Sequence, residues 1–266
     1  MGSSSIFRDG LLSGRTAIVT GGGTNLGRHA AAELHACGAR VVIAGRTEEV
    51  LAEAAGTIGC DYAVGDIRDA ESAASIVGAA GDRLDLLVNN AGGQYFVPAE
   101  SITAKGWAAV MRLNVEGTMT MTQAALPALR ASAGTVVNIT VSPHHGMPAM
   151  AHTGAARAAV EALTKELSAA EPDVTFIAAA IGRFDTESLR KYPEVVLRGA
   201  ARSVPLQRLG RMEEFGWLVA LLASPAARAL DGSVVTLDGG VDNWTGPWPP
   251  PNILDDEGTV PTEARR

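Results

Sequence analysis

The residues Thr16-Ala17-Ile18-Val19-Thr20 are followed at once by Gly21-Gly22-Gly23-Thr24-Asn25-Leu26-Gly27. The short run with β-branched residues predicts a strand, the glycine cluster predicts a tight turn, and residues 26–37 have a helical pattern. In this order, backbone N–H groups and the positive end of the helix dipole converge on one point, which suits a diphosphate. The stretch therefore indicates the first strand of a dinucleotide-binding fold. We expect the cofactor to contact Gly21, Gly23, Asn25, Leu26 and Gly27.

The turn departs from the usual dinucleotide fingerprint at one position, where Asn25 stands in place of glycine. Asparagine tolerates a left-handed backbone better than any residue except glycine, so we expect the turn to survive the change. The alternative interpretation is a glycine turn that only connects a strand to a helix.

Composition limits the classes of protein to consider. The chain has 266 residues, of which 47% are hydrophobic and 19% charged, enough for one substantial core. The net charge of −7 and the lack of a basic tract argue against nucleic acid or an anionic membrane as partners. No apolar run reaches the roughly 18 residues of a membrane span, and no signal peptide opens the chain. Cys37 and Cys60 form neither a CxxC pair nor a disulfide framework, which fits a reducing cytoplasm, and we expect no metal site.

Apolar, strand-like runs alternate with helical patterns along the chain. We expect strands at 16–20, 40–44, 61–64, 84–89, 135–140, 174–179 and 233–237, and helices near 26–37, 47–56, 69–80, 103–131, 150–170 and 212–223. This alternation predicts an α/β fold, with a single doubly wound Rossmann domain around a seven-stranded parallel sheet.

The domain is expected over residues 12–240, after an N-terminal extension at 1–11. Residues 183–210 interrupt the alternation and are interpreted as a substrate lid. Residues 241–266 form a tail rich in Trp and Pro, which we expect either to dock on a surface or to be disordered.

Further landmarks follow the glycine turn in a fixed order. They are Asp66 at the tip of the third strand, Asn89-Asn90-Ala91-Gly92, Asn114 within Asn-Val-Glu-Gly-Thr, Val136-Val137-Asn138-Ile139 and Leu237-Asp238-Gly239-Gly240. Together these residues resemble the short-chain dehydrogenase/reductase family over residues 12–240. The resemblance implies an NAD(P)-dependent oxidoreductase, and the pairing of long helices in that family implies a homotetramer or homodimer.

A narrower likeness is carried by other segments. Residues 89–95, 98–100, 105–107 and 152–158 look like peroxisomal trans-2-enoyl-CoA reductases, and residues 205–210 are shared with 2,4-dienoyl-CoA reductases. Both groups reduce carbon–carbon double bonds of acyl-CoA thioesters with NADPH. The likeness therefore implies a small-molecule substrate, with an acyl-CoA as the leading candidate.

The end of the second strand bears on the choice of coenzyme. An acidic residue at this position binds the ribose 2′-OH and repels a 2′-phosphate, but here Gly45 occupies it and Arg46 follows. A guanidinium can grip a 2′-phosphate, so NADP(H) is preferred over NAD(H). The alternative for Arg46 is a solvated arginine at a helix start. The resemblance adds further cofactor-binding residues, namely Asp66 and Ile67 near the adenine, Asn90, Ala91 and Gly92 after the fourth strand, and Gly182, Phe184 and Thr186 near the nicotinamide.

The family's catalytic machinery is Asn, Ser and a Tyr-x-x-x-Lys pair. By resemblance, Asn114 is retained, Ser142 lies one residue beyond the serine position, and Thr153 and Arg157 stand for the tyrosine and lysine. A second possible register, two turns later, reads Glu161 and Lys165, and neither register keeps the tyrosine.

These substitutions favour one chemistry over another. A threonine hydroxyl is too weak an acid to replace a phenol, and arginine stays cationic, although it can hold ribose hydroxyls or stabilise an anion on a thioester oxygen. Reduction of an enoyl thioester, which needs an enolate stabilised by donors, is therefore better served than reduction of a ketone. Candidate replacement acids are Tyr95, Tyr192, His144, His145 and His152, although the tyrosines can instead be packing residues and the histidines exposed loop or helix-start residues.

Two other functions stay open on the sequence. One is a nucleotide-binding protein without redox activity that serves as a scaffold or sensor, favoured by the absent tyrosine and lysine. The other is a non-redox biosynthetic enzyme on the same fold, such as a dehydratase or isomerase.

Overall fold

Seven parallel strands form one sheet in the order β3-β2-β1-β4-β5-β6-β7. This sheet belongs to a computed structural model that describes residues 3–142, 144–146, 148–190 and 199–243. The strands are β1 (Thr16–Thr20), β2 (Arg40–Gly45), β3 (Asp61–Val64), β4 (Leu86–Asn89), β5 (Thr135–Val141), β6 (Thr175–Ile181) and β7 (Val234–Leu237). The predicted doubly wound Rossmann fold with a seven-stranded parallel sheet is confirmed, and strand ends differ from the predicted bounds by at most two residues.

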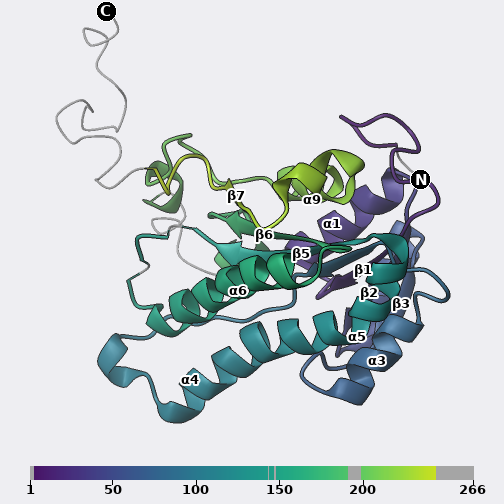
Figure 1. Cartoon of the computed structure of the whole chain (residues 1–266). Helices are drawn as coiled ribbons and strands as arrows, with labels where there is room; N and C mark the ends of the chain where they lie inside the picture. The colour runs from purple at the N-terminus through teal and green to yellow at the C-terminus, as the bar shows by residue number, and fades with distance from the viewer. Residues whose placement is uncertain (1–2, 143, 147, 191–198, 244–266) are drawn as a thin grey trace, which may run out of the picture.

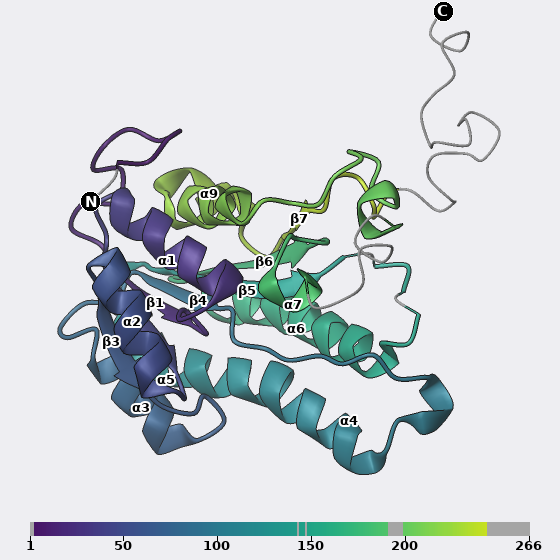
Figure 2. The same cartoon turned by 180° about the vertical axis from the view of Figure 1, so that it is seen from behind.

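Helices cover both faces of this sheet (Figures 1 and 2). One face carries α1, α2 and α9, and the other carries α3, α5 and α6, with α4 packed beside α6. The bounds are α1 (Asn25–Ala36), α2 (Glu48–Ile58), α3 (Ala70–Gly78), α4 (Ala104–Met111), α5 (Gly117–Ser132), α6 (Ala151–Ala170), α7 (Glu187–Arg190) and α9 (Met212–Ala223), with short 3₁₀ turns at Ala99–Ser101 and Pro225–Leu230.

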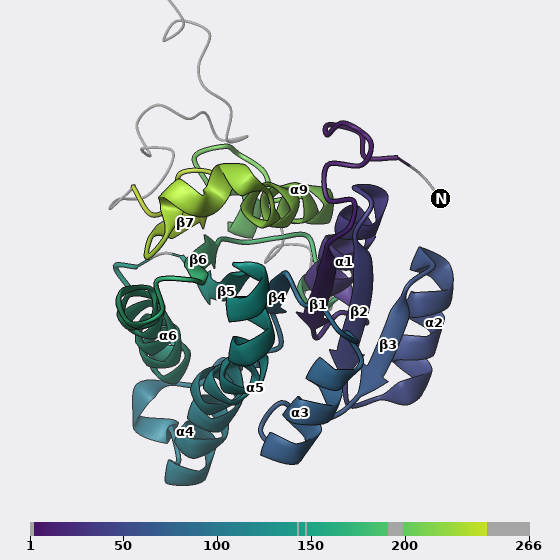
Figure 3. The same cartoon turned by 45° about the vertical axis from the view of Figure 1, so that its right-hand side comes forward.

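The core is divided by the sheet into two apolar clusters. In β1 the side chains alternate, so that Ala17 and Val19 join the cluster under α1 and α9, whereas Ile18 joins the cluster under α3 and α5. Figure 3, in which the sheet lies between these helices, shows the two layers. Burial on both faces is why the strands read as nearly continuous apolar runs in the sequence.

The strand order reverses beside β1, which pairs with β2 on one side and with β4 on the other. The connections from β1 and β4 therefore leave in opposite directions and open a crevice at the carboxyl ends of these strands. Asn90 links the loop after β4 to the end of β1, because its Nδ2 donates hydrogen bonds to the carbonyl oxygens of Thr20 (2.9 Å) and Gly21 (3.3 Å). The Thr20 hydroxyl also accepts hydrogen bonds from the backbone amides of Asn90 and Ala91.

The glycine turn between β1 and α1 has the predicted backbone. Gly21 has φ 64° and Asn25 has φ 43°, so asparagine does adopt the left-handed conformation expected of it. Gly27 is needed for a different reason. A Cβ at this position would lie 2.2 Å from the carbonyl oxygen of Gly21 and 2.5 Å from Asn90 Nδ2. The start of α1 can approach the turn this closely only without a side chain.

The expectation of one regular helix over 103–131 is wrong in detail. The chain forms α4, then a π-helical turn at Arg112–Glu116, then α5. Asn114 supplies a physical reason, because its side-chain Nδ2 donates to the carbonyl oxygen of Val110 at 2.8 Å. That carbonyl is the one that the backbone N–H of Asn114 would use in an α-helix, so the side chain competes with the regular ladder.

Part of the predicted lid and most of the predicted tail lie outside the described residues. In the lid, Lys191 and Tyr192 fall in the gap at 191–198, and the tail is described only to Asn243. Within the described part of the chain, no helix has the length and apolar character needed to cross a membrane.

The close approach at Gly27 gives a stability prediction. We expect Gly27→Ala to lower the free energy of unfolding by about 1–3 kcal/mol, because the added methyl group meets backbone atoms that cannot move independently. Gly56→Ala is the matched control, since Gly56 lies in α2 with no atom within 4 Å of an added Cβ. It should raise stability by about 0.5–1 kcal/mol. Urea unfolding measures both variants, and an unchanged Gly27→Ala protein would contradict the packing described here.

Candidate functional site

Two adjoining cavities run along the carboxyl edge of the sheet. The first has a volume of about 290 Å³ and lies over β2 and β3. The second has a volume of about 750 Å³ and lies over β4, β5 and β6. Gly21, Thr24, Ala91 and Gly92 line both cavities, so they form the junction at the point where the strand order reverses.

Every residue that the sequence predicts to bind the cofactor lines at least one of these cavities. The first cavity is lined by Gly23, Arg46, Asp66 and Ile67, together with the shared residues. The second cavity takes in Asn25, Leu26, Gly27, Asn90, Tyr95, Ser142, Arg157, Gly182, Phe184 and Thr186. The fold therefore gathers residues from seven separate parts of the chain at one edge.

Asp66 is held by a neighbour that the sequence analysis did not consider. Arg68 Nε donates to Asp66 Oδ1 at 2.9 Å, and its backbone N–H donates to the same oxygen at 3.0 Å. These hydrogen bonds lower the pKa of Asp66 to about 2, so the carboxylate is ionised near neutral pH and can accept a hydrogen bond from an amino group. The spacing Asp-x-Arg was the available signal.

Arg46 lies at the same cavity on the edge of β2. Its side chain is exposed, and its charge contributes to lowering the pKa of Asp66. Gly45 beside it places no acidic group at the tip of β2. The cavity therefore offers a guanidinium, not a carboxylate, at this position.

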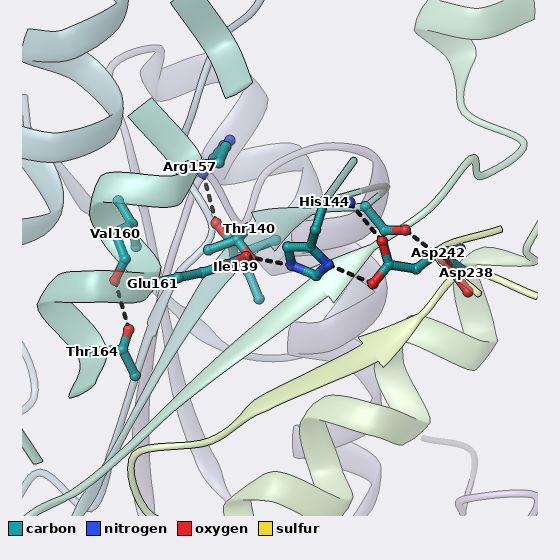
Figure 4. Close-up of polar contacts among 10 residues, drawn as sticks. Ile139, Thr140, His144, Arg157, Val160, Glu161, Thr164, Asp238 and Asp242 are labelled. Carbon is teal, nitrogen blue, oxygen red and sulfur yellow. Dashed lines mark hydrogen bonds and ion pairs between the residues drawn. The ribbon is translucent and has the colours of Figure 1, made fainter. Parts of the chain in front are cut away.

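Arg157 is the buried charge of the second cavity. The residue is 8% exposed, and its Nη1 donates to the carbonyl oxygen of Ile139 at 2.7 Å (Figure 4). Its Nε has no hydrogen-bond partner among the described residues, and none of their carboxylates pairs with it. Burial lowers the pKa of this guanidinium to about 10, so it remains charged near neutral pH.

Gly92 allows the guanidinium of Arg157 to come close to the loop after β4. A Cβ on Gly92 would lie 2.3 Å from Arg157 Nη2 and 2.7 Å from Asn114 Oδ1. Asn114 is fully buried and does not line either cavity; its Nδ2 donates to the carbonyl oxygen of Gly93 at 2.9 Å. Asn114 therefore shapes the loop that carries Gly92 and Gly93.

The start of α6 contains further unpaired polar groups. Thr153 is fully buried, and its hydroxyl has no hydrogen-bond partner among the described residues. The same holds for both ring nitrogens of His152, whose ring packs edge-on against Tyr95 with centroids 4.4 Å apart. Tyr95 is 41% exposed and lines the second cavity, so it is the accessible member of this pair.

The loop after β5 is tied to other elements by polar contacts. Ser142 lines the cavity, but its hydroxyl donates to Asp238. His144 lies between two carboxylates, with Nδ1 2.5 Å from Asp242 Oδ2 and Nε2 2.9 Å from Glu161 Oε1 (Figure 4). Glu161 also accepts a hydrogen bond from the Thr140 hydroxyl at 2.7 Å. Glu161, the residue at the tyrosine position in the second possible register, is therefore engaged by Thr140 and His144.

Comparison with known proteins identifies the family. Residues 22–242 match the family model described as enoyl-(acyl carrier protein) reductase. The chain belongs to the short-chain dehydrogenase/reductase family. The members of this oxidoreductase family bind NAD(P). Its 2,4-dienoyl-CoA reductases are among the relatives of this chain, as the narrower likeness in the sequence indicated.

Individual relatives cover nearly the whole domain. A rhamnolipids biosynthesis 3-oxoacyl-[acyl-carrier-protein] reductase of Pseudomonas aeruginosa is 35% identical over 86% of this chain and 96% of its own length. A probable 2,4-dienoyl-CoA reductase of Bacillus subtilis is 31% identical over 88% of this chain and 98% of its own length. Among solved structures, the Pseudomonas aeruginosa RhlG/NADP active-site complex has a TM-score of 0.82 and 32% identity, and the match covers 89% of this chain and 100% of that one.

The described residues include no cluster of His, Cys, Asp and Glu arranged to hold a metal ion.

The unpaired charge of Arg157 gives a second stability prediction. We expect Arg157→Met to change the free energy of unfolding by less than about 1.5 kcal/mol, because it removes a desolvated charge together with one hydrogen bond. Arg83→Met is the comparison. Although Arg83 is exposed, it pairs with the buried carboxylate of Asp85, which would lose its charged partner and keep the hydrogen bond from the backbone N–H of Thr16. The Arg83 variant should be the less stable of the two in thermal unfolding, and the reverse order would show that Arg157 is a structural residue.

Proposed function

We propose that this chain is an NADPH-dependent reductase that acts on an activated carbon–carbon double bond, with an enoyl thioester as substrate. The observation that carries the proposal is Arg157, a buried cation with no carboxylate partner among the described residues, at a cavity where the related tyrosine position holds Thr153. The site therefore has Arg157 as a hydrogen-bond donor for an anion, but no tyrosine at the position that Thr153 occupies.

The crevice fits a dinucleotide along its length. Gly21, Gly23 and Gly27 line the cavities at the N-terminus of α1, where backbone N–H groups can bind a diphosphate. Asp66 and Ile67 line the cavity where an adenine would lie, and Asn90, Ala91 and Gly92 line the junction toward the nicotinamide side. Gly182, Phe184 and Thr186 complete the proposed set at the far end.

Charge at the tip of β2 favours the phosphorylated coenzyme. An acidic residue at the position of Gly45 would repel a 2′-phosphate, and glycine has no such charge. Arg46 beside it can donate hydrogen bonds to the 2′-phosphate. A related solved structure is a complex with NADP, which agrees with this preference.

The chain's own residues can then be assigned roles. NADPH, when bound, supplies the hydride that reduces the β-carbon of the enoyl group. Negative charge then develops on the thioester oxygen, and the guanidinium of Arg157 can stabilise it or hold the ribose hydroxyls. Asn114 positions the loop at Gly93, and Ser142 lines the same cavity as a polar group. Thr153 is fully buried and lines neither cavity, and its hydroxyl is too weak an acid to act as the donor.

The proton for the α-carbon needs another source. Tyr95 is the proposed donor, because this residue lines the cavity and is 41% exposed; its hydroxyl lies beside Gly106 of α4 and would turn toward the substrate to donate. Water is the alternative source in this half-open site. In either case the proton goes to carbon after the hydride, so the reaction does not need an acid at the position of Thr153.

The proposed substrate rests on the relatives, and the proposed assembly rests on the composition of α6. An acyl-CoA is proposed as substrate because a relative is a probable 2,4-dienoyl-CoA reductase. The alanine-rich surface of α6 would allow close packing of helices between subunits, and we propose a homotetramer or homodimer located in the cytoplasm.

A redox-inactive nucleotide-binding protein is the second candidate. Two observations favour it: the Ser142 hydroxyl donates to Asp238, and the Thr153 hydroxyl is buried. Such a protein would bind NADPH without consuming it, so a turnover assay separates the two.

An assay with paired substrates tests the proposed reaction. We expect the purified protein to oxidise NADPH in the presence of crotonyl-CoA and to be at least about tenfold less active with acetoacetyl-CoA, because a ketone needs a proton delivered to oxygen. Absorbance at the nicotinamide band measures both rates. Tyr95→Phe should lower the enoyl rate, and Tyr62→Phe, a tyrosine on β3 that lines neither cavity, is the control. Faster reduction of the ketone, or binding of NADPH with no turnover on either substrate, would contradict the proposal.

A further inference from the structure

One histidine joins three parts of the chain that are far apart in sequence. His144 belongs to the loop between β5 and α6, Glu161 lies on α6, and Asp242 follows β7. The backbone N–H of His144 also donates to Asp242 Oδ1 at 2.6 Å. In Figure 4 the imidazole ring lies between the two carboxylates, with one nitrogen directed to each.

The chemistry of imidazole restricts the protonation state of this arrangement. Neutral imidazole has one N–H donor and one lone pair, whereas the imidazolium ion has two donors. Each ring nitrogen of His144 is within hydrogen-bond distance of a carboxylate oxygen, which can only accept when ionised. Both contacts are therefore satisfied only by the imidazolium, and in the neutral form one carboxylate would face a lone pair.

The surrounding charges act in the same direction. Burial lowers the pKa of His144, but the hydrogen bonds and charges of Asp242 and Glu161 outweigh this effect, so the pKa is raised above its ordinary value. Burial raises the pKa of Asp242, and the contacts with His144, together with the charge of His145, lower it overall. Asp238 adds a further carboxylate near this point, since its Oδ2 accepts the backbone N–H of Asp242 at 2.7 Å.

The loop that His144 fixes forms a wall of the larger cavity. Ser142, Gly146, Pro148 and Met150 of this loop all line it. Ser142 is also bonded to Asp238, so the loop is attached to the segment after β7 at two points, one on each side of residue 143.

We propose that His144 is a positioning residue whose imidazolium clamps the loop after β5 onto α6 and onto the segment after β7, and thereby sets the shape of the substrate end of the crevice. The clamp itself does not depend on the reaction, whereas its effect on turnover rests on the proposed function. His144 contacts neither cavity and acts only through the loop.

The clamp should weaken as the pH rises. Because the folded-state pKa of His144 is raised, the stabilisation is fully present below the ordinary value of 6.5 and is lost as the pH rises through the folded-state value. Neutral His144 can keep only one of its two contacts, and Asp242 and Glu161 then lose the positive charge between them.

Amide hydrogen exchange resolved by residue tests the clamp without substrate or coenzyme. The amides of His144 and Asp242 are the reporters, since each donates to a carboxylate of the network. After correction for the intrinsic rate, their protection in the unaltered protein should fall between about pH 6 and about pH 9. His144→Gln should lack this protection at both values. His145→Gln, which removes a nearby charge but leaves both ring contacts of His144 in place, is the matched control and should keep the fall in protection with pH.

A second variant tests whether a carboxylate raises the pKa of His144. Asp242→Asn removes one of the two charges that favour the imidazolium, so the midpoint of the pH transition of His144, measured by NMR of its ring proton, should move to lower pH. Equal protection in the unaltered protein and in His144→Gln near pH 6 would overturn the clamp, and so would an unshifted midpoint in Asp242→Asn.

Steady-state kinetics tests whether the clamp affects substrate binding in the crevice. With crotonyl-CoA, KM of the unaltered protein should rise with pH over the same range while kcat changes little, and His144→Gln should have a high KM at both pH values. If exchange behaves as expected and no turnover is found, the proposed reaction fails and the clamp stands. A KM with the same pH profile in His144→Gln as in the unaltered protein would contradict the link between clamp and crevice.

Discussion

The site depends on the contact between the glycine turn after β1 and Asn90 after β4. Asn90 donates to the carbonyl oxygens of Thr20 and Gly21, and the Thr20 hydroxyl receives the amides that begin the loop after β4. These bonds join two strands at the place where their connections part, and Gly27 lets the start of α1 lie against them. Gly21 and Ala91, which line both cavities, are held directly by these hydrogen bonds.

The two charged groups at the ends of the crevice, Arg157 and Asp66, differ in whether another charged side chain pairs with them. Burial of the Arg157 guanidinium, which has no carboxylate partner among the described residues, costs free energy. Arg157 lies behind Gly92 at the end of the crevice where chemistry would occur, whereas Asp66 at the other end is neutralised by Arg68. The two ends therefore differ in what they can accept, with an anion favoured near Arg157 and a hydrogen-bond donor favoured near Asp66.

The sequence predicted the fold because its signals are local and agree with each other. Runs such as Thr16–Thr20 and the left-handed Asn25 follow from β-branched residues, glycine and asparagine, which act within a few residues. The π-helical turn at Asn114 was missed, because it arises when a side chain takes a backbone acceptor. The contacts of His144 with Glu161 and Asp242 could not be predicted either. They join residues 17 and 98 positions apart, and spacing alone gives no sign that the sheet brings them together.

Titration calorimetry of the pure protein with NADPH and with NADH tests the central claim most directly, namely that the crevice holds a phosphorylated nicotinamide dinucleotide. The account predicts one site per chain and an affinity for NADPH at least about tenfold higher than for NADH, the difference arising from charge-assisted hydrogen bonds to Arg46. Arg46→Ala should remove that difference and leave NADH unaffected, while Arg28→Ala, which removes an arginine paired with Glu53, should change neither affinity. Absence of binding by both coenzymes would contradict the account of the crevice, and equal affinities in the unaltered protein would contradict the role of Arg46.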